Sequence, residues 1–345
     1  MSRVIVFGLD NKSLGEFDAN VDRSWTIDGS PASSGGGSST IVIPDSVAAM
    51  NILQFGQMIM VTHDNLPVWA GMIDTPWKAL LPVQLTAYNA EYLLSQRCPD
   101  GPITMQAPLA QILNEMINQA NIQEEMYIRL GNVDGLDGTI RQESFDQRPF
   151  WDQMKALLLR AGCEMTVRPQ RDPTDGNRLY IYLDVKKQVG IDTGYLLHDG
   201  ENANIKIADA SVEGTILNRV TGISGESTQT SRKQTIPQLS IDSLLSYRLR
   251  SIIQQFQGVI DDATLLANAV NFLNQNAAPK LKLTIQILDV GNAFSICAPG
   301  NIVLLHGANL WLPGGVHGWR GFMRLITLEY AEGNNTLSAT VIGTL

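Results

Sequence analysis

The feature that most constrains this chain is a pattern of glycine-led, strand-like runs that occurs twice. Gly300 and Gly321 each open an apolar run near the C-terminus, and the three runs there cover residues 300–305, 321–330 and 337–342. Gly56 opens a comparable set near the N-terminus, at residues 56–61, 69–73 and 83–87. Two copies of one β module in a single chain indicate a symmetric, ring-like or tubular architecture.

Length and composition favour two or three globular domains. The chain has 345 residues and 44% hydrophobic residues, enough to build cores at roughly 100–200 residues per domain. No stretch approaches the roughly 20 uncharged apolar residues of a membrane span, and the first residues lack the apolar core of a secretory signal. We therefore expect no membrane span, and a protein that is made and stays soluble in the cytoplasm.

Charge and side-chain chemistry argue against nucleic-acid binding, metal binding and cofactor use. A net charge of −9 disfavours phosphate contacts, which need clustered Lys and Arg, so no sequence-specific nucleic-acid binding is expected. Cys98, Cys163 and Cys297 are far apart, without a C-x-x-C pair, and indicate reduced, buried thiols. The four histidines show no metal-ligand spacing. We expect no catalytic residue, no metal site and no cofactor.

The chain divides into three parts, in an α+β, mainly β fold. Residues 1–98 contain five or six predicted strands, which suits a small barrel. A Ser/Gly-rich run at 33–39 is predicted to be a loop between strands. The turn Pro99–Pro102 marks the first boundary. Residues 99–195 form an α+β domain, and residues 196–345 a second β-barrel with a polar and helical insertion at about 226–278.

Helical periodicity and capping residues support the helices within these parts. Apolar residues from 109 to 117 share one helical face, and a second helix is predicted from Pro149 to Gly162, a residue type that often ends helices. A hairpin follows at 164–168 and 179–185, with Asp184 predicted to face outward. Residues 243–257 are a candidate helix. Asp261 or Asp262 caps another helix, which is predicted to bury Leu266, Ala269, Val270 and Leu273.

Several short motifs, in their order and spacing, resemble one known family. In the first part they are Trp25, residues 41–44, residues 55–57 and residues 69–73. In the last part they are Asn218–Gly222 as an entry strand, Asp242 with Tyr247, the helix before Pro279, and the turn and strand at 299–303. This series is similar to the tail-hub family of tailed bacteriophages, which includes the central baseplate hub, the late control protein D type and the N-terminal part of type VI secretion spikes. Arg248 stands where that family usually has glycine.

The resemblance implies two similar tube-like barrels per subunit and a homotrimer with pseudo-sixfold geometry. Such a hub would join a sixfold tail tube or distal tail ring protein to a threefold spike or fibre, with a tape measure protein as a further partner. It would be a virion structural protein of the tail tip or baseplate, assembled in the host bacterial cytoplasm. We also expect that the acidic balance of the chain lets DNA pass through the lumen without sticking.

Three tryptophans are candidates for partner contact. Trp77, Trp311 and Trp319 lie in or beside loops containing proline or glycine, where a large aromatic side chain either packs under the loop or is presented to a partner.

Two alternative functions stay open at this stage. A tail-associated enzyme that degrades the cell wall would need a further domain, and the sequence ends at Leu345, right after the last predicted strand. A carbohydrate-binding receptor module would gather its aromatic residues on one concave face, whereas the tryptophans here are scattered along the chain.

Overall fold

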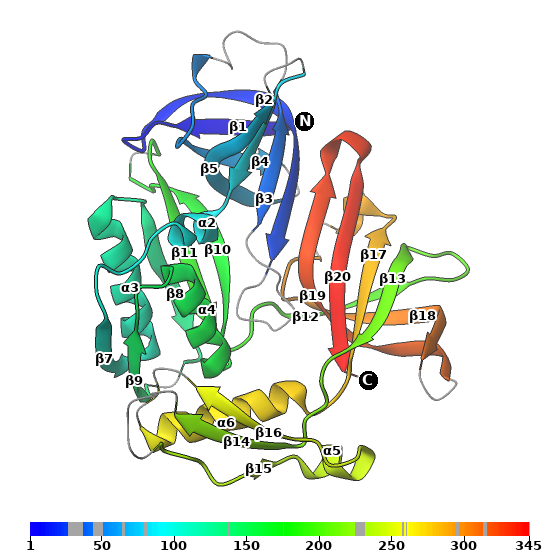
Figure 1. The fold of residues 1–345 in the computed structure, drawn as a ribbon. Coiled ribbons are helices and arrows are strands. Elements are labelled where there is room, and N and C mark those ends of the chain that lie inside the picture. Colours follow the sequence, from blue (N-terminus) through cyan, green and yellow to red (C-terminus); the bar gives the residue numbers. More distant parts are fainter. Residues whose placement is uncertain are drawn as a thin grey trace.

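The computed structural model describes residues 1–26, 37–43, 51–63, 66–78, 82–136, 138–174, 176–224, 232–256, 259, 261–293, 297–312 and 316–344. Strands dominate these residues, and helices are few (Figure 1). The predicted mainly β fold is therefore confirmed. The predicted loop at 33–39 and the predicted polar and helical insertion at about 226–278 fall partly outside the described residues.

Six antiparallel strands from the N-terminal part of the chain close into a barrel. They are β1 (Ser2–Phe7), β2 (Ser13–Thr26), β3 (Ser38–Val42), β4 (Met58–His63), β5 (Leu66–Lys78) and β6 (Gln84–Tyr88). They lie in the order β1-β4-β5-β6-β3-β2, and pairing of β1 with β2 closes the ring. Alternate residues such as Val4, Val21, Ile59 and Leu85 are fully buried inside, as the two-residue period of a strand requires.

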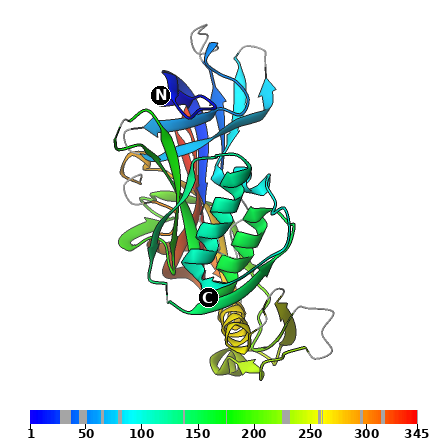
Figure 2. The same ribbon diagram turned by 90° about the vertical axis from the view of Figure 1, so that its left-hand side faces the viewer.

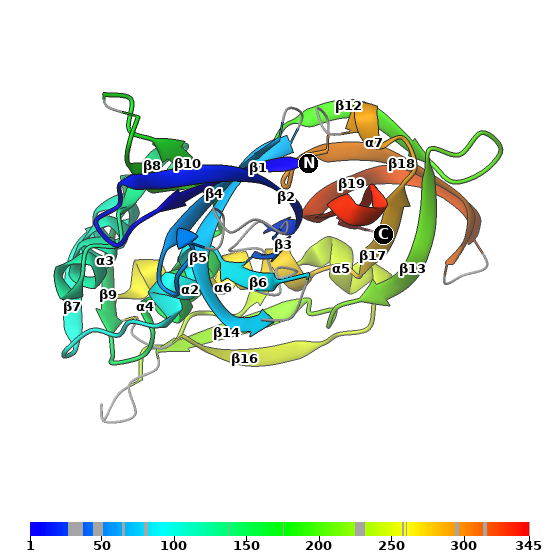
Figure 3. The same ribbon diagram turned by 90° about the horizontal axis from the view of Figure 1, so that it is seen from above.

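A second set of six strands has the same spatial order. They are β12 (Asp192–His198), β13 (Ile205–Glu213), β17 (Lys280–Ile287), β18 (Ile302–Leu312), β19 (Val316–Ala331) and β20 (Thr336–Thr344). Their order is β12-β18-β19-β20-β17-β13. In both sets the chain order therefore reads first, fourth, fifth, sixth, third, second. One difference is that β12 runs parallel to β18, whereas β1 runs antiparallel to β4. Seen from above, the two barrels lie side by side (Figure 3).

The glycines that open the repeated runs form the same turn in both barrels. Gly56 has φ +82° and Gly300 has φ +98°, a region that residues with a Cβ rarely adopt. The Gly56 N–H donates to the carbonyl of Ile73 at 3.0 Å, and the Gly300 N–H donates to that of Leu325 at 2.8 Å. The carbonyl of the residue after each glycine accepts the N–H of the same partner in return. The repeat read from the sequence is thus a repeat in structure.

The middle region packs two helices on a small sheet. The sheet has the order β10 (Glu164–Arg171), β11 (Leu179–Lys186), β8 (Ile128–Asp134), and a separate pair joins β7 (Ile103–Pro108) to β9 (Ile140–Phe145). The helices α3 (Leu109–Gln123) and α4 (Phe150–Ala161) lie side by side over this sheet (Figure 2), and α2 (Ala90–Ser95) packs against α4. Their core continues into the first barrel through Ile5, Phe7 and Met60. Gly162, with φ +65°, ends α4 as predicted.

The predicted outward position of Asp184 is wrong. Its side chain is 8% exposed, because β11 is the central strand and groups on both neighbouring strands, β10 and β8, bind the carboxylate. The carboxylate pairs with Nε of Arg168 at 2.6 Å and accepts the N–H of Asn132 at 2.7 Å. A buried charge of this kind needs such partners.

The chain between β13 and β17 forms a separate unit below the barrels (Figure 1). Its sheet has the order β15 (Gln238–Leu239), β14 (Arg219–Ser224), β16 (Ser251–Phe256), and α6 (Asp262–Asn276) covers it. The assignment of Asn218–Gly222 to the second barrel is therefore wrong, because β14 is the centre of this separate sheet. The short helices elsewhere are α7 (Val290–Ala293) and η1 (Glu332–Asn334).

Two helix predictions in this unit need correction. The candidate helix at 243–257 is wrong beyond its first turn: α5 (Ile241–Ser246) ends there, and pairing with β14 turns residues 251–256 into a strand. In α6, Asp261 caps the helix by accepting the Thr264 N–H at 2.7 Å, as predicted. Leu266 is exposed, however, because the buried stripe runs through Leu265, Ala269 and Leu273. The domain limits at 98 and 195 stay a prediction.

Candidate assembly surfaces

The two barrels are joined by a strand pair, β2 with β19. The last residues of β2 lie opposite Thr327–Tyr330 of β19, with Trp25 opposite Leu328 and Ser24 opposite Glu329. Leu328 is fully buried, and Trp25 packs against the cores of both barrels. An apolar cross-strand pair of this kind stabilises a sheet, so the barrels are connected through one continuous hydrogen-bonded sheet.

A buried arginine lies beside this junction. The guanidinium of Arg23 lies 5.7 Å from the ring centroid of Trp25 and 5.9 Å from that of Tyr330. Its Nη2 lies 3.9 Å from Oε2 of Glu332. Burial lowers the pKa of Arg23 to about 10, although Glu332 acts to raise it. Glu332 also accepts hydrogen bonds from Ser2 and from a backbone N–H of β2, which fixes the end of β19 against the first barrel.

A second connection ties the middle region to the second barrel. Both terminal nitrogens of Arg324, in β19, donate to the carboxylate of Glu164, in β10. The same guanidinium donates to the carbonyl of Val189 at 2.6 Å and, through Nε, to that of Gly300 at 3.1 Å. Bidentate charged pairs of this geometry are among the strongest hydrogen bonds in proteins. Gly190 lies against Gly300, where a Cβ would meet the Gly300 carbonyl carbon at 2.1 Å.

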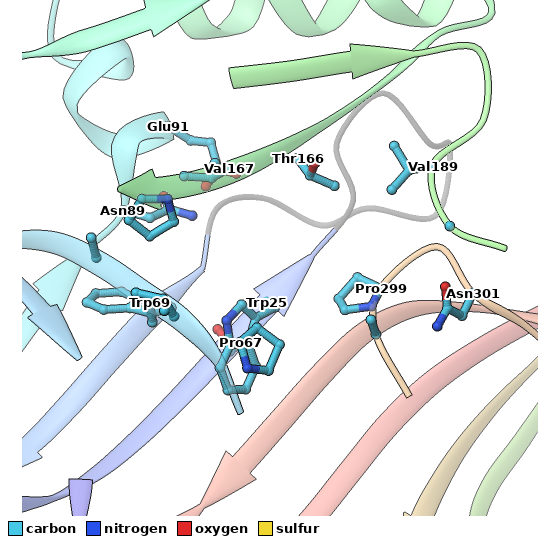
Figure 4. Close-up of a pocket in the computed structure, with 16 residues that line it drawn as sticks. Trp25, Pro67, Trp69, Asn89, Glu91, Thr166, Val167, Val189, Pro299 and Asn301 are labelled. Carbon is cyan, nitrogen blue, oxygen red and sulfur yellow. The ribbon is translucent and has the colours of Figure 1, made fainter. Parts of the chain in front are cut away.

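A cavity of about 280 Å³ lies where the three parts of the chain meet (Figure 4). Trp25, Pro67 and Trp69 contribute from the first barrel, Val167 from β10, and Pro299 from the turn before β18. Among its described lining residues Glu91 is the one titratable group, and its carboxylate accepts the Gly37 N–H at 3.2 Å. The described lining therefore lacks the paired carboxylates of a glycoside hydrolase.

The structure does not bring the three candidate tryptophans together. Trp77 is half-buried on β5 of the first barrel, where its ring packs edge-on against Phe55 at a centroid distance of 5.3 Å. Trp319 packs on the core of the second barrel, over Gly321. Trp311 lies on β18 opposite His317 in β19, and its side chain lies outside the described part of the chain. Their role in partner contact stays a prediction.

The sequence reasoning missed an exposed apolar surface on the separate unit. Large aliphatic side chains stand in solvent along β15, α5, β16 and the connections between them: Ile236, Leu239, Ile241, Leu245, Leu249 and Ile253. The opposite side of this unit is anchored, since Asn271 and Gln275 of α6 donate to carbonyls of α4. Exposed apolar residues along neighbouring elements make this side of the unit a candidate surface for protein contact. The Leu- and Ile-rich run at 236–253 was the available signal, but the pattern at residues 243–257 indicated only a candidate helix.

Two further features to consider in the described residues are metal sites and membrane-spanning helices. Within them, no group of three or more His, Cys, Asp and Glu side chains is placed to hold a metal ion. None of the helices there combines the length and apolarity needed to cross a bilayer.

Comparison of the sequence with family models and with curated proteins gives no match. Comparison of the fold with solved structures does. The 43 kDa tail protein of prophage MuSo2 from Shewanella oneidensis aligns with a TM-score of 0.60 and 10% identity, covering 99% of this chain and 98% of that one. The chain has the fold of phage tail proteins.

Two further structures agree over almost the same length. The prophage tail protein gp18 from Listeria monocytogenes EGD-e has a TM-score of 0.59 at 13% identity, covering 99% of this chain and 94% of that one. The tail protein from Neisseria meningitidis MC58 has a TM-score of 0.58 at 12% identity, covering 99% and 96%. The predicted resemblance to tail proteins is thereby confirmed at the level of the fold.

Proposed function

We propose that this protein is a structural hub subunit of a phage tail tip or baseplate. Three copies would form a ring in which six similar barrels surround a lumen. This ring would connect a sixfold tail tube or distal tail ring protein to a threefold spike or fibre, and DNA would pass through it. The work would be done through interfaces, without catalysis, in the virion.

The duplicated barrel is the observation that carries this proposal. Two modules with one strand order, joined edge to edge by β2 and β19, give each chain two nearly equivalent contact positions. Three such chains can therefore match a sixfold partner on one side and a threefold partner on the other. The fold shared with three tail proteins supports the same role.

The mass of the purified chain in solution tests the proposal. Native mass spectrometry over a range of concentrations should give a species of three times 37.8 kDa. A stable dimer or tetramer would contradict the trimeric ring. A cell-wall digestion assay addresses the proposed lack of catalysis, and a clear zone around the purified protein would favour the enzyme instead.

A further inference from the structure

The strand registers identify which residues of one barrel correspond to which residues of the other. The count starts at Ile73 and Leu325, which accept the hydrogen bonds of the glycine turns. In the first barrel, Ile73 lies opposite Ala87, Ala87 opposite Ser39, and Ser39 opposite Arg23. In the second barrel, Leu325 lies opposite Val341, Val341 opposite Leu283, and Leu283 opposite Ala210. In the second strand of each barrel, β2 and β13, Arg23 therefore corresponds to Ala210. Trp25, two residues after Arg23, corresponds to Val212.

The fifth strands correspond in the same way. Trp77 lies opposite Leu85, two residues before Ala87, and Leu328 lies opposite Ala339, two residues before Val341. Both strands carry a register shift just before this point. Trp77 therefore corresponds to Leu328, and Lys78 to Glu329.

The correspondence shows that each of the two junction edges occurs once in each barrel. The copies on β2 and β19 pair with each other within the chain, and the copies on β13 and β5 have no such partner among the described strands. Within the chain, the end of β2 pairs with β19. Its counterpart, the end of β13, has β17 as its one strand partner among the described residues, and in Figures 1 and 3 it lies on the side of the second barrel away from the first. Burial differs accordingly: Arg23 is 3% exposed, whereas Ala210 is exposed and Val212 is 42% exposed.

The counterpart of β19 in the first barrel also lacks a partner strand on one side among the described residues. Pairing of β5 with β4 ends at Met72, whereas pairing of β5 with β6 goes on to Lys78. After Met72, no described strand pairs with β5 on the side where β4 lay. Trp77 lies on this segment, and its neighbour Phe55 is 54% exposed. A strand edge with exposed apolar side chains is a template for pairing with another chain.

We infer that β13 of one copy pairs antiparallel with the end of β5 of a second copy, in the register of the β2–β19 junction. Val212 then lies opposite Trp77 of the other copy, as Trp25 lies opposite Leu328 within the chain, and Ser211 lies opposite Lys78. The contact joins two different edges head to tail, a type that gives a ring when the rotation from copy to copy closes and a filament when it does not. This inference rests on the proposed homotrimer and assigns the surface that builds it.

Engineered cysteine pairs test this register. Cys98 is exposed, so the predicted burial of this cysteine is wrong. In a Cys98→Ser background, which removes this exposed thiol, Ser211→Cys is combined with Lys78→Cys. The matched positive control is Ser24→Cys with Glu329→Cys, the equivalent pair within one chain. Ser211→Cys with Asp18→Cys is the negative control, since Asp18 is exposed on a different strand. Opposed antiparallel residues lie within disulfide reach.

After mild oxidation, the test pair should give covalent dimers and trimers on a non-reducing gel, at a yield within about twofold of the disulfide formed in the positive control. The negative control should stay monomeric on the same gel. One outcome is a trimeric native mass, with a disulfide in the positive control but none in the test pair. The β13–β5 contact would then be wrong and the trimer would stand. If the chain is linked but its native mass is not trimeric, the contact stands and the proposed ring fails. A monomeric, unlinked chain overturns both.

Discussion

Replacing Arg324 with methionine tests whether the connection between the middle region and the second barrel is a major source of stability. The change keeps much of the apolar stem but leaves the Glu164 carboxylate buried, at 12% exposure, without its cation. Breaking a buried pair in this way costs about 3–5 kcal/mol. Urea unfolding followed by circular dichroism should therefore show a clearly lower midpoint at an unchanged slope.

The matched control is Arg148→Met. Arg148 pairs with Asp146 at 2.8 Å, but both side chains are more than half exposed, and such pairs contribute less than about 1 kcal/mol. The double variant Arg324→Met/Glu164→Gln leaves no unpaired charge. Its loss in free energy of unfolding should therefore be smaller than the sum of the losses of Arg324→Met and Glu164→Gln. Equal midpoints for Arg324→Met and Arg148→Met would refute the reasoning.

Three further predictions concern single residues. Gly300→Ala should lower the free energy of unfolding by at least about 1–3 kcal/mol, because φ is +98° and a Cβ would lie 2.6 Å from the carbonyl oxygen of Val189; an unchanged urea midpoint would show that the turn tolerates a Cβ. A thiol reagent near neutral pH should modify exposed Cys98 quickly and Cys297 only after unfolding, because burial raises the pKa of Cys297 to about 11 and the thiolate is the reactive form; equal rates would contradict this. Asp261→Ala should lower the free energy of unfolding by about 0.5–2 kcal/mol and Asp261→Ser by much less. Equal decreases for the two variants in urea unfolding would argue against the cap.

Local signals allowed much of the fold to be predicted from the sequence. The repeat around Gly56 and Gly300 was readable because a turn with positive φ selects glycine and the following strand selects apolar residues. The helix at 109–123 was readable because its buried face follows a period of 3.6 residues. Each of these signals lies within a short stretch of chain.

Features set by distant segments could not be predicted. Asp184 alternates like an outward residue, but its burial depends on the strands on either side of β11. Residues 251–256 become a strand because β14 pairs with them, which overrides their local preference. The correspondence of Trp77 with Leu328 needs the registers of four strands, so the sequence could mark Trp77 as a candidate without saying which edge it lies on.

An electron cryomicroscopy reconstruction of the assembled protein would test the central claim most directly. We expect three chains in one closed ring, with first and second barrels alternating around the lumen and β13 of each chain paired with β5 of the next. A reconstruction in which the first barrels contact only first barrels, or in which one barrel of each chain lies outside the ring, would contradict the account.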